Sequence, residues 1–201
     1  MRFSSALLSL LVAFMLVACG GGTDEGTMED DTLGMMEADT AMGDEDLDAG
    51  MGAMSMPTWM QMDETARTVS MDITAGESDV NNRWNFNGLY AGNGRIVVPE
   101  GYTVTINFTN ADPTQPHSLG IEETMATWPA TFETPEPVFE GAITPDAGTT
   151  GTGAGGGTAT VTFTTGAAGD YAMVCYIAGH AVAGMVVPFT VSADGSAGAE
   201  Q

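Results

Sequence analysis

The sequence predicts an all-β sandwich of seven or eight strands, preceded by a signal peptide and a disordered acidic segment. Residues 68–193 contain short runs of alternating apolar and polar residues, separated by turns rich in Gly, Pro, Asn and Asp, which is the pattern of half-buried strands. No run in this region has the apolar periodicity of a helix. Residues 1–67 differ in composition and periodicity, so we place them outside the folded domain.

Residues 1–18 have the features of a bacterial signal peptide. Arg2 supplies a positive end, and an apolar run interrupted only by Ser9 extends to Ala18. This run is too short to span a membrane. It closes with Leu16-Val-Ala-Cys19, which resembles a lipobox, in which the cysteine is lipidated and becomes the mature N-terminus. We expect an exported protein, lipid-anchored through Cys19, with its folded domain in the periplasm or outside the cell. An ordinary cleaved signal peptide or a short anchor is the alternative.

Residues 19–67 are predicted to form a disordered linker. Between Gly20 and Met62 there are 11 acidic residues and no basic one, and such a segment buries too little apolar surface to offset its ordering entropy. The segment is also rich in methionine, whose thioether binds Cu(I). It therefore acts either as a copper-gathering tether or as a plain spacer in which methionine is tolerated. Its methionines are Met28, Met35, Met36, Met42, Met51, Met54, Met56, Met60 and Met62.

The strands of the domain follow from local alternation. The clearest is 102–109, in which Tyr102, Val104, Ile106 and Phe108 alternate with polar residues. The other expected strands cover residues 69–74, 83–88, 94–99, 117–121, 158–165, 170–177 and 185–192, with a further candidate at 138–143.

The remaining segments of the domain give weaker patterns. Residues 122–157 are hard to assign, and the glycine run 151–157 lacks the lysine and the following helix of a phosphate-binding loop. It is expected to be a flexible hairpin loop. Residues 194–201 are expected to form a flexible tail.

Charge narrows the classes of partner. The chain contains 27 acidic and 4 basic residues, all arginine, for a net charge of −23. This balance argues against binding to nucleic acid or to anionic lipid. It favours cationic partners, or a saline medium that screens the self-repulsion of a salt-adapted protein.

Four residues stand out as metal-ligand candidates. Cys175, His180 and Met185 are spaced five residues apart, and His117 is the only other histidine. One thiolate, two imidazoles and a weak thioether make the ligand set of a mononuclear blue (type 1) copper electron-transfer site. Each residue alone is more often an ordinary core or surface residue. Together, at a strand end, in the loop that follows it and next to another strand, they predict one bound copper ion.

The cysteine count agrees with this assignment. If Cys19 is lipidated, Cys175 is the only thiol left in the mature domain, so no internal disulfide can form. An unpaired thiol in an oxidising compartment is prone to oxidation, and metal ligation is a good reason to keep it.

Three motifs resemble the cupredoxins, most closely the sulfocyanins and then the rusticyanins. They are Asn85-Phe-Asn-Gly88, Pro116-His117-Ser-Leu119 and Cys175-Tyr-Ile-x-Gly-His180-Ala-x-x-Gly-Met185. The resemblance covers about residues 84–191. It implies a cupredoxin-like Greek-key sandwich that carries electrons and is not an enzyme.

The resemblance also implies roles and partners. His117, Cys175 and His180 would be equatorial ligands of a copper ion cycling between Cu(II) and Cu(I), and Met185 the axial ligand. The donor would be a quinol-oxidising complex or a cytochrome, and the acceptor a terminal oxidase. We expect a monomer.

The surroundings of the ligands suggest two further roles. Ser118 either donates a hydrogen bond to the Cys175 sulfur, which would raise the reduction potential, or satisfies the local backbone. Small apolar residues flank His180 and form either a docking patch around the imidazole edge or a buried loop. They are Ile177, Ala178, Ala181, Val182, Ala183 and Gly184.

Other metal and enzyme classes fit less well. A binuclear copper site needs a second cysteine where Gly179 stands, and a multicopper oxidase needs more histidines. Zinc gains nothing from a methionine, and a hydrolytic thiol would have to be exposed beside a base. The serious alternative is an extracytoplasmic copper-binding, storage or chaperone protein, with the methionine-rich linker as collector.

Overall fold

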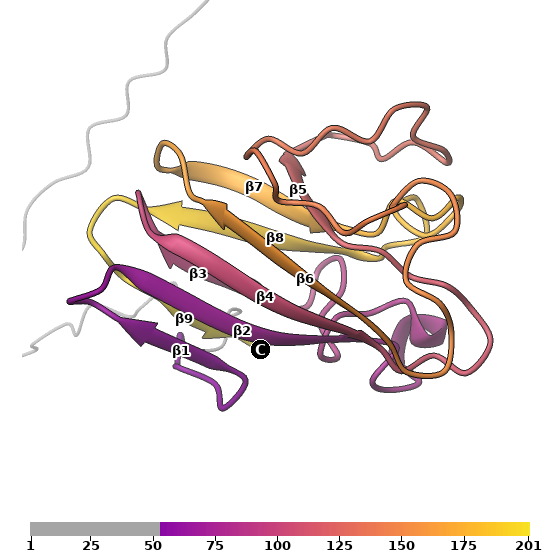
Figure 1. Cartoon of the computed structure of the whole chain (residues 1–201), viewed down its shortest axis with the longest axis horizontal. Coiled ribbons are helices and arrows are strands. Elements are labelled where there is room, and N and C mark those ends of the chain that lie inside the picture. The colour runs from indigo at the N-terminus through magenta and orange to yellow at the C-terminus, as the bar shows by residue number, and fades with distance from the viewer. Residues whose placement is uncertain (1–52) are drawn as a thin grey trace, which may run out of the picture. The chain divides into compact units, whose positions relative to one another are not determined.

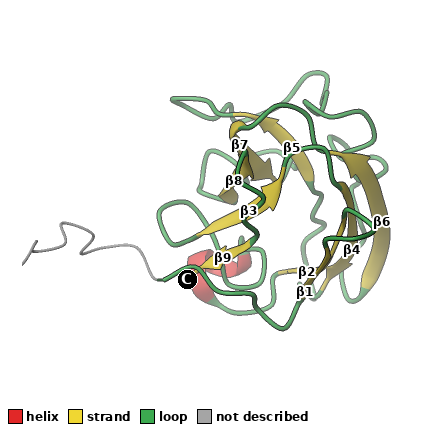
Figure 2. Ribbon diagram, turned by 90° about the vertical axis from the view of Figure 1, so that its left-hand side faces the viewer, coloured by secondary structure: helices red, strands yellow, loops and turns green. Residues whose placement is uncertain are grey.

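The structure, a computed structural model, describes residues 53–201, which form two β-sheets that face each other across an apolar interior (Figures 1 and 2). The first sheet contains, in spatial order, β1 (Met60–Asp63), β2 (Thr68–Ala75), β4 (Thr103–Asn110) and β6 (Gly157–Thr164). The second contains β5 (Gly120–Glu123), β7 (Gly169–Val174), β8 (Val186–Ser192), β3 (Arg95–Pro99) and β9 (Gly198–Glu200). This arrangement confirms the predicted all-β sandwich. The predicted signal peptide, Cys19 and the linker up to residue 52 lie outside the described residues.

Three strands of the first sheet, β2, β4 and β6, are built as their alternation predicts. β2 runs parallel to β4 in a register that places Val69 opposite Val104, and β4 pairs antiparallel with β6. Alternate side chains on each strand are buried, so one face of the sheet lines the core and the other faces solvent. The inward residues include Val69, Met71, Ile73, Val104, Ile106, Phe108, Val161 and Phe163.

The second sheet is covered on both faces, which explains why residues 122–157 could not be read from the sequence. Met173, Val187 and Phe189 face the first sheet. On the outer face, Val174 and Val186 belong to a second apolar cluster, which includes residues of the loop between β5 and β6. That loop contains isolated bridges and turns but no strand at 138–143. Its apolar side chains Trp128 and Phe132 pack against the cluster that contains Val174 and Val186.

Three sequence-based boundaries are wrong within the described residues. The linker was expected to extend to residue 67, but Ser55 pairs with Ala199 and β1 pairs with β2. The flexible tail instead contains β9, which pairs antiparallel with β3. The expected strand 83–88 is not formed, since its first residue ends a 3-10 turn (Val80–Arg83) and Phe86 forms only isolated bridges. Strands of three or four residues have too little alternation to be recognised, and only pairing with distant segments defines them. The described residues therefore contain nine strands rather than seven or eight.

Among residues 53–201, no helix is long and apolar enough to cross a membrane.

Candidate metal centre

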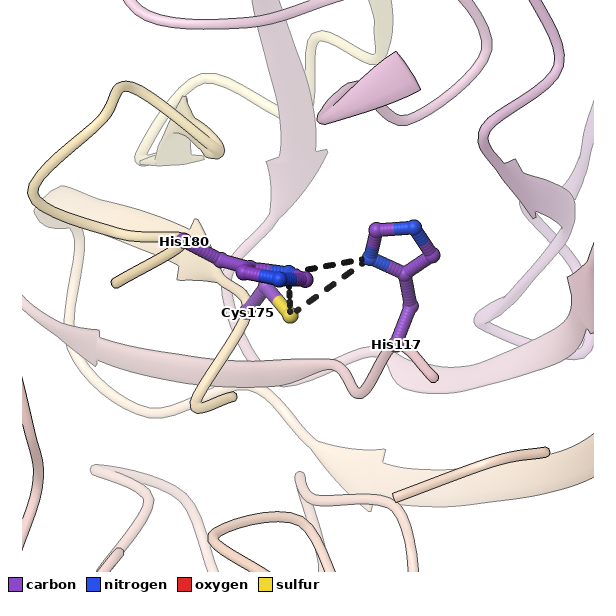
Figure 3. Close-up of side chains that lie close together, drawn as sticks. All are labelled: His117, Cys175 and His180. Carbon is purple, nitrogen blue, oxygen red and sulfur yellow. Dashed lines mark hydrogen bonds between the residues drawn. The ribbon is translucent and has the colours of Figure 1, made fainter. Parts of the chain in front are cut away.

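Three of the predicted ligands bring their donor atoms together at one end of the sandwich (Figure 3). The Cys175 sulfur lies 3.5 Å from Nδ1 of His180 and 3.9 Å from Nδ1 of His117, and the two nitrogens are 3.2 Å apart. Cys175 and His117 are fully buried and His180 is 3% exposed. Residues 58 positions apart therefore form one compact, solvent-excluded cluster.

The spacing of these atoms fits one metal ion. In zinc sites, metal–nitrogen bonds are about 2.0 Å long and metal–sulfur bonds about 2.3 Å. With bonds of these lengths and ligand–metal–ligand angles of about 105–130°, the donor atoms of one metal ion lie about 3.2–3.9 Å apart. The three separations all fall in that range. A thiolate with two imidazoles in a trigonal arrangement is the ligand set of a type 1 copper site.

The loop after β7 positions Cys175 and His180 through backbone hydrogen bonds. The Cys175 amide donates to the Met185 carbonyl, and the Met185 amide donates to the His180 carbonyl. Gly179 and Gly184 have φ angles of +87° and +98°, which residues with a side chain rarely adopt. The eleven residues from Cys175 to Met185 thus close on themselves, and the buried Met185 sits at their end, next to the first residue of β8.

The glycine run holds the other histidine. The amides of His117 and Thr152 each donate to the carbonyl of the other residue, so the two segments form a short bridge. A Cβ atom at Gly151 would lie 2.7 Å from the His117 carbonyl oxygen, so only glycine permits this approach. The run that the sequence suggested was a flexible hairpin loop therefore helps to position a ligand.

A buried carboxylate that sequence reasoning missed lies behind His117. Oδ2 of Asp112, which is 1% exposed, lies 3.2 Å from Nε2 of His117. A carboxylate only accepts hydrogen bonds, so Nε2 carries the proton and Nδ1 presents its lone pair to the cluster. The sequence contained a signal for it, an aspartate five residues before a ligand histidine in a turn, but the turn alone explains an aspartate there.

The charge of Asp112 is maintained by several donors. Burial by itself would raise its pKa, but hydrogen bonds from the amides of Thr114 and Gln115, from His117 and from the Thr114 hydroxyl outweigh burial and lower the pKa to about 2. Asp112 is therefore an anion at any pH near neutrality, and its negative charge lies one imidazole away from the cluster.

Ser118 combines the two roles left open by the sequence. Its amide lies 3.4 Å from the Cys175 sulfur, and its hydroxyl oxygen lies 3.7 Å from the same atom. That hydroxyl oxygen also accepts a hydrogen bond from the Tyr176 amide at 2.9 Å. Since the accepted bond leaves the hydroxyl hydrogen free, Ser118 can direct it toward the sulfur and satisfy the local backbone at the same time.

The metal-free cluster is uncharged near neutral pH. Burial raises the pKa of the Cys175 thiol to about 11, so the thiol keeps its proton. Burial, reinforced by His117, lowers the pKa of His180 to about 4. Burial also lowers the pKa of His117, although Asp112 opposes this effect. Binding of a cation at this site must therefore displace the thiol proton, whereas the imidazoles are already neutral.

The loop around His180 is only partly a surface patch. Ala178, Val182 and Ala183 are exposed, with Val182 at 53%, whereas Ala181 is buried. The His180 ring does not reach the surface as an open edge. The indole of Trp84 stacks on it, with ring centroids 4.6 Å apart and planes inclined by 20°.

Tyr176, the residue after Cys175, is fixed by a buried carboxyl group. Its hydroxyl donates to Oε1 of Glu122 at 2.9 Å, and its ring packs against Phe132. A Cβ atom at Gly120 would lie 2.5 Å from the same ring, so glycine makes room for it. This packing restrains the backbone on the C-terminal side of Cys175.

We expect Glu122→Gln to make the protein more stable at pH values above 4.5. Burial raises the pKa of Glu122 in the folded protein above its ordinary value of 4.5. At pH values between 4.5 and the folded-state pKa, the folded protein therefore binds more protons than the unfolded chain. Stability therefore decreases as pH rises through this interval. Glutamine keeps the acceptor for Tyr176 without the buried charge, so the gain should vanish below pH 4.5.

Urea unfolding of both proteins across this pH range measures the difference. Glu123→Gln, on the same strand but exposed, is the matched control and should show no such pH-dependent gain. A gain for Glu122→Gln that stayed constant down to acid pH would contradict this explanation.

Comparisons with known proteins agree with these observations. The chain matches the sulfocyanin (SoxE) domain over residues 55–199. Sulfocyanin of Sulfolobus acidocaldarius is 34% identical over 125 residues, which cover 59% of this chain and 61% of the relative's length.

Among solved structures, auracyanin A, a blue copper protein from Chloroflexus aurantiacus, is 24% identical, with 62% of this chain and 99% of that chain covered and a TM-score of 0.43. Reduced rusticyanin is 23% identical, with 63% and 77% covered and a TM-score of 0.43. The family match begins at Ser55 and ends at Ala199, two residues that pair with each other. The chain therefore belongs to the sulfocyanin (SoxE) domain family.

Proposed function

We propose that this protein is a type 1 copper electron-transfer protein that passes single electrons between redox partners. The observation that carries this proposal is the buried triangle formed by the Cys175 sulfur and the Nδ1 atoms of His117 and His180. When bound there, copper supplies a one-electron Cu(II)/Cu(I) couple. We further propose Met185 as the axial ligand, because it closes the loop that carries Cys175 and His180.

Burial of the ligands favours electron transfer over copper storage or delivery. A delivery protein hands its metal to a partner by ligand exchange, which needs at least one ligand that the partner can reach. Cys175 and His117 have no exposed surface and His180 has 3%. The backbone bonds around them hold the donors in one arrangement, so little has to move when the copper changes oxidation state.

The setting of the domain is part of the proposal. Lipidation at Cys19 would anchor it to a bacterial membrane on the exported side, and the acidic linker would let it swing between partners. A quinol-oxidising complex or cytochrome would be the donor and a terminal oxidase the acceptor. Residues 96–201 contain neither lysine nor arginine, so partners with cationic docking faces are favoured.

The visible spectrum of the copper-loaded chain tests the proposal. The chain from Gly20 onward, which lacks the signal peptide and the lipidation site but keeps β1 and Ser55, is loaded with one equivalent of Cu(II). An intense thiolate-to-copper band that bleaches on reduction and returns on oxidation is the expected result. A colourless protein that takes up only Cu(I) would instead support copper storage or delivery.

Replacing the proposed axial ligand should shift the reduction potential. Met185→Leu is expected to keep the copper and the colour but to raise the potential, because a weak donor to Cu(II) is lost. A tenfold loss of Cu(II) affinity relative to Cu(I) corresponds to about 59 mV for a one-electron couple, and we expect a shift of about that size or larger. Cyclic voltammetry measures it.

The control for this variant is Met71→Leu. Met71 is a buried methionine on β2, and the exchange of Met for Leu conserves volume. Met71→Leu should leave the potential unchanged. An unchanged potential in Met185→Leu would mean that another group, or none, is the axial ligand.

A further inference from the structure

The indole of Trp84 lies over a proposed ligand without taking part in the ligand set. We propose that Trp84 is the outer end of the electron path of this site, so that electrons enter and leave through His180 and then the Trp84 ring. This inference rests on the proposed function as an electron carrier. It gives Trp84 the surface role that one of the two sequence-based alternatives gave to the edge of the His180 imidazole.

The exposure of the two rings supports this order. His180 is 3% exposed, so a partner reaches almost none of its imidazole directly. Trp84 is half-buried and therefore has both an inner face on His180 and an outer surface in contact with solvent. Centroids 4.6 Å apart with an interplanar angle of 20° make an offset stack, which leaves no room for a solvent layer between the rings.

The backbone turn before Trp84 has an unusual conformation. Asn81, Asn82 and Arg83 have φ angles of 47°, 56° and 67°, three consecutive non-glycine residues in the left-handed region. Backbone strain of this kind persists only where the surroundings impose it.

Several contacts impose this strain. The Trp84 amide donates to the Asn81 carbonyl at 2.9 Å, and the Asn81 side-chain amide donates to the Trp84 carbonyl at 2.8 Å. Arg83 forms an ion pair with Asp79 and donates to the Gly76 carbonyl. A Cβ atom at Gly184 would lie 3.4 Å from the Asn81 side chain, so the turn packs against the loop that carries His180.

The redox step through this path balances without chemistry at the indole. With copper bound at the site, the His180 imidazole and the Trp84 indole would conduct one electron from Cu(I) to a one-electron oxidant docked outside. The oxidant would gain that electron, the copper would be left as Cu(II), and no proton or bond would change place. Tunnelling rates fall steeply with distance, and they fall faster through solvent than through bonded or stacked groups. The stacked rings of His180 and Trp84 should therefore carry the electron to the surface faster than solvent across the same distance would.

The test compares Trp84→Leu, Trp84→Phe and the control Trp128→Leu. Trp128 is a partly buried tryptophan of the outer apolar cluster and lies outside the ligand loop. The measurement is electron self-exchange between Cu(I) and Cu(II) copies by NMR line broadening, at high salt so that the net charge of −23 is screened. Because both proteins in self-exchange dock through Trp84, the substitution changes both sides of the transfer and should slow it more than it would slow transfer to a different partner.

Trp84→Leu should slow self-exchange by about tenfold or more, equal to about 1.4 kcal/mol in activation free energy. The blue band should remain, Trp84→Phe should restore most of the rate, and Trp128→Leu should match the wild type. A wild-type rate in Trp84→Leu would overturn the inference, and so would a rate that phenylalanine does not restore. A wild-type protein with no blue band would instead mean that the proposed function fails, and the inference would fail with it.

The copper-free protein provides a separate readout of the stack. The ring current of the indole should shift the His180 ring protons upfield in the wild type, less in Trp84→Phe and not in Trp84→Leu. Ring protons at the same position in the wild type and Trp84→Leu would show that the rings do not stack, which would also overturn the inference.

Discussion

Replacing Cys175 with serine is expected to abolish the intense visible absorption of the copper-loaded protein. The band requires charge transfer from a thiolate, and a serine hydroxyl supplies neither the soft sulfur nor an accessible anion. The position is completely buried between the two imidazoles, so no other thiol can take its place within the described residues. Affinity for Cu(I), which prefers sulfur, should fall more than affinity for Cu(II).

The same variant should change the protons released when copper binds. Because burial raises the pKa of the Cys175 thiol to about 11, the wild type must lose one proton per Cu(II) bound at pH 7–8. The pKa of His180 lies at about 4, so that imidazole releases none in this range. The Cys175→Ser variant should release close to no proton. Titration with Cu(II) in weakly buffered solution and a pH indicator counts the protons directly.

The fold of the variant must be intact for these results to count. The Ser118 amide, which lies 3.4 Å from the sulfur, keeps an acceptor when serine replaces cysteine. We therefore expect the copper-free variant to give a dispersed NMR spectrum like that of the copper-free wild type. If the folded variant stayed blue, Cys175 would not be a ligand and the assignment of the whole cluster would be wrong.

The spacing of a few residues was enough to predict most of the candidate site. Cys175 and His180 lie in one strand-loop segment, and the five-residue interval between them is set by the local chain. His117 could be added because the sequence contains only one other histidine. These predictions needed residue chemistry and local strand assignment, and no knowledge of how the sheets pack.

Asp112 and Trp84 could not be predicted because their roles depend on tertiary geometry. Asp112 accepts hydrogen bonds from its own turn, and nothing local shows that its second oxygen faces His117. Trp84 reaches His180 from far away in the sequence, after a turn of three consecutive left-handed residues whose packing the local sequence does not reveal. The short strands β1 and β9 were missed for a related reason, since pairing with distant segments, not alternation, defines them.

Replacing Asp112 with asparagine is expected to weaken Cu(II) binding and raise the reduction potential. The carboxylate accepts the Nε2 proton of His117 and so keeps the Nδ1 lone pair directed at the Cys175 sulfur and His180. Its negative charge also favours the more positive oxidation state of the metal. Loss of a partner behind a metal ligand typically costs 10–100-fold in metal affinity, which sets the expected size, about 10–100-fold for Cu(II).

Asparagine cannot replace the carboxylate in this position. The amides of Thr114 and Gln115 both donate to Oδ1 of Asp112, so the asparagine oxygen is needed there. Its NH₂ group would then face Nε2 of His117 and could only donate to it. The His117 proton would be driven to Nδ1, which is the nitrogen that must be free to bind the metal.

This tautomer change separates the role of Asp112 from a general loss of stability. Two-bond ¹H–¹⁵N NMR spectra of the copper-free protein should show His117 protonated at Nε2 in the wild type and at Nδ1 in Asp112→Asn. Competition with a chelator should show the loss of Cu(II) affinity, and voltammetry the rise in potential. If Cu(II) loses ten times more affinity than Cu(I), the potential rises by about 59 mV.

Asp194→Asn is the matched control for this substitution. Asp194 also accepts a hydrogen bond from an amide two residues ahead, but it is exposed in the C-terminal segment, outside the ligand-bearing loops. Its replacement should change neither the tautomer of His117 nor the potential. If Asp112→Asn kept the Nε2 proton and the wild-type potential, the buried carboxylate would serve only to hold its turn. The orientation of His117 would then have to come from its bridge to Thr152 alone.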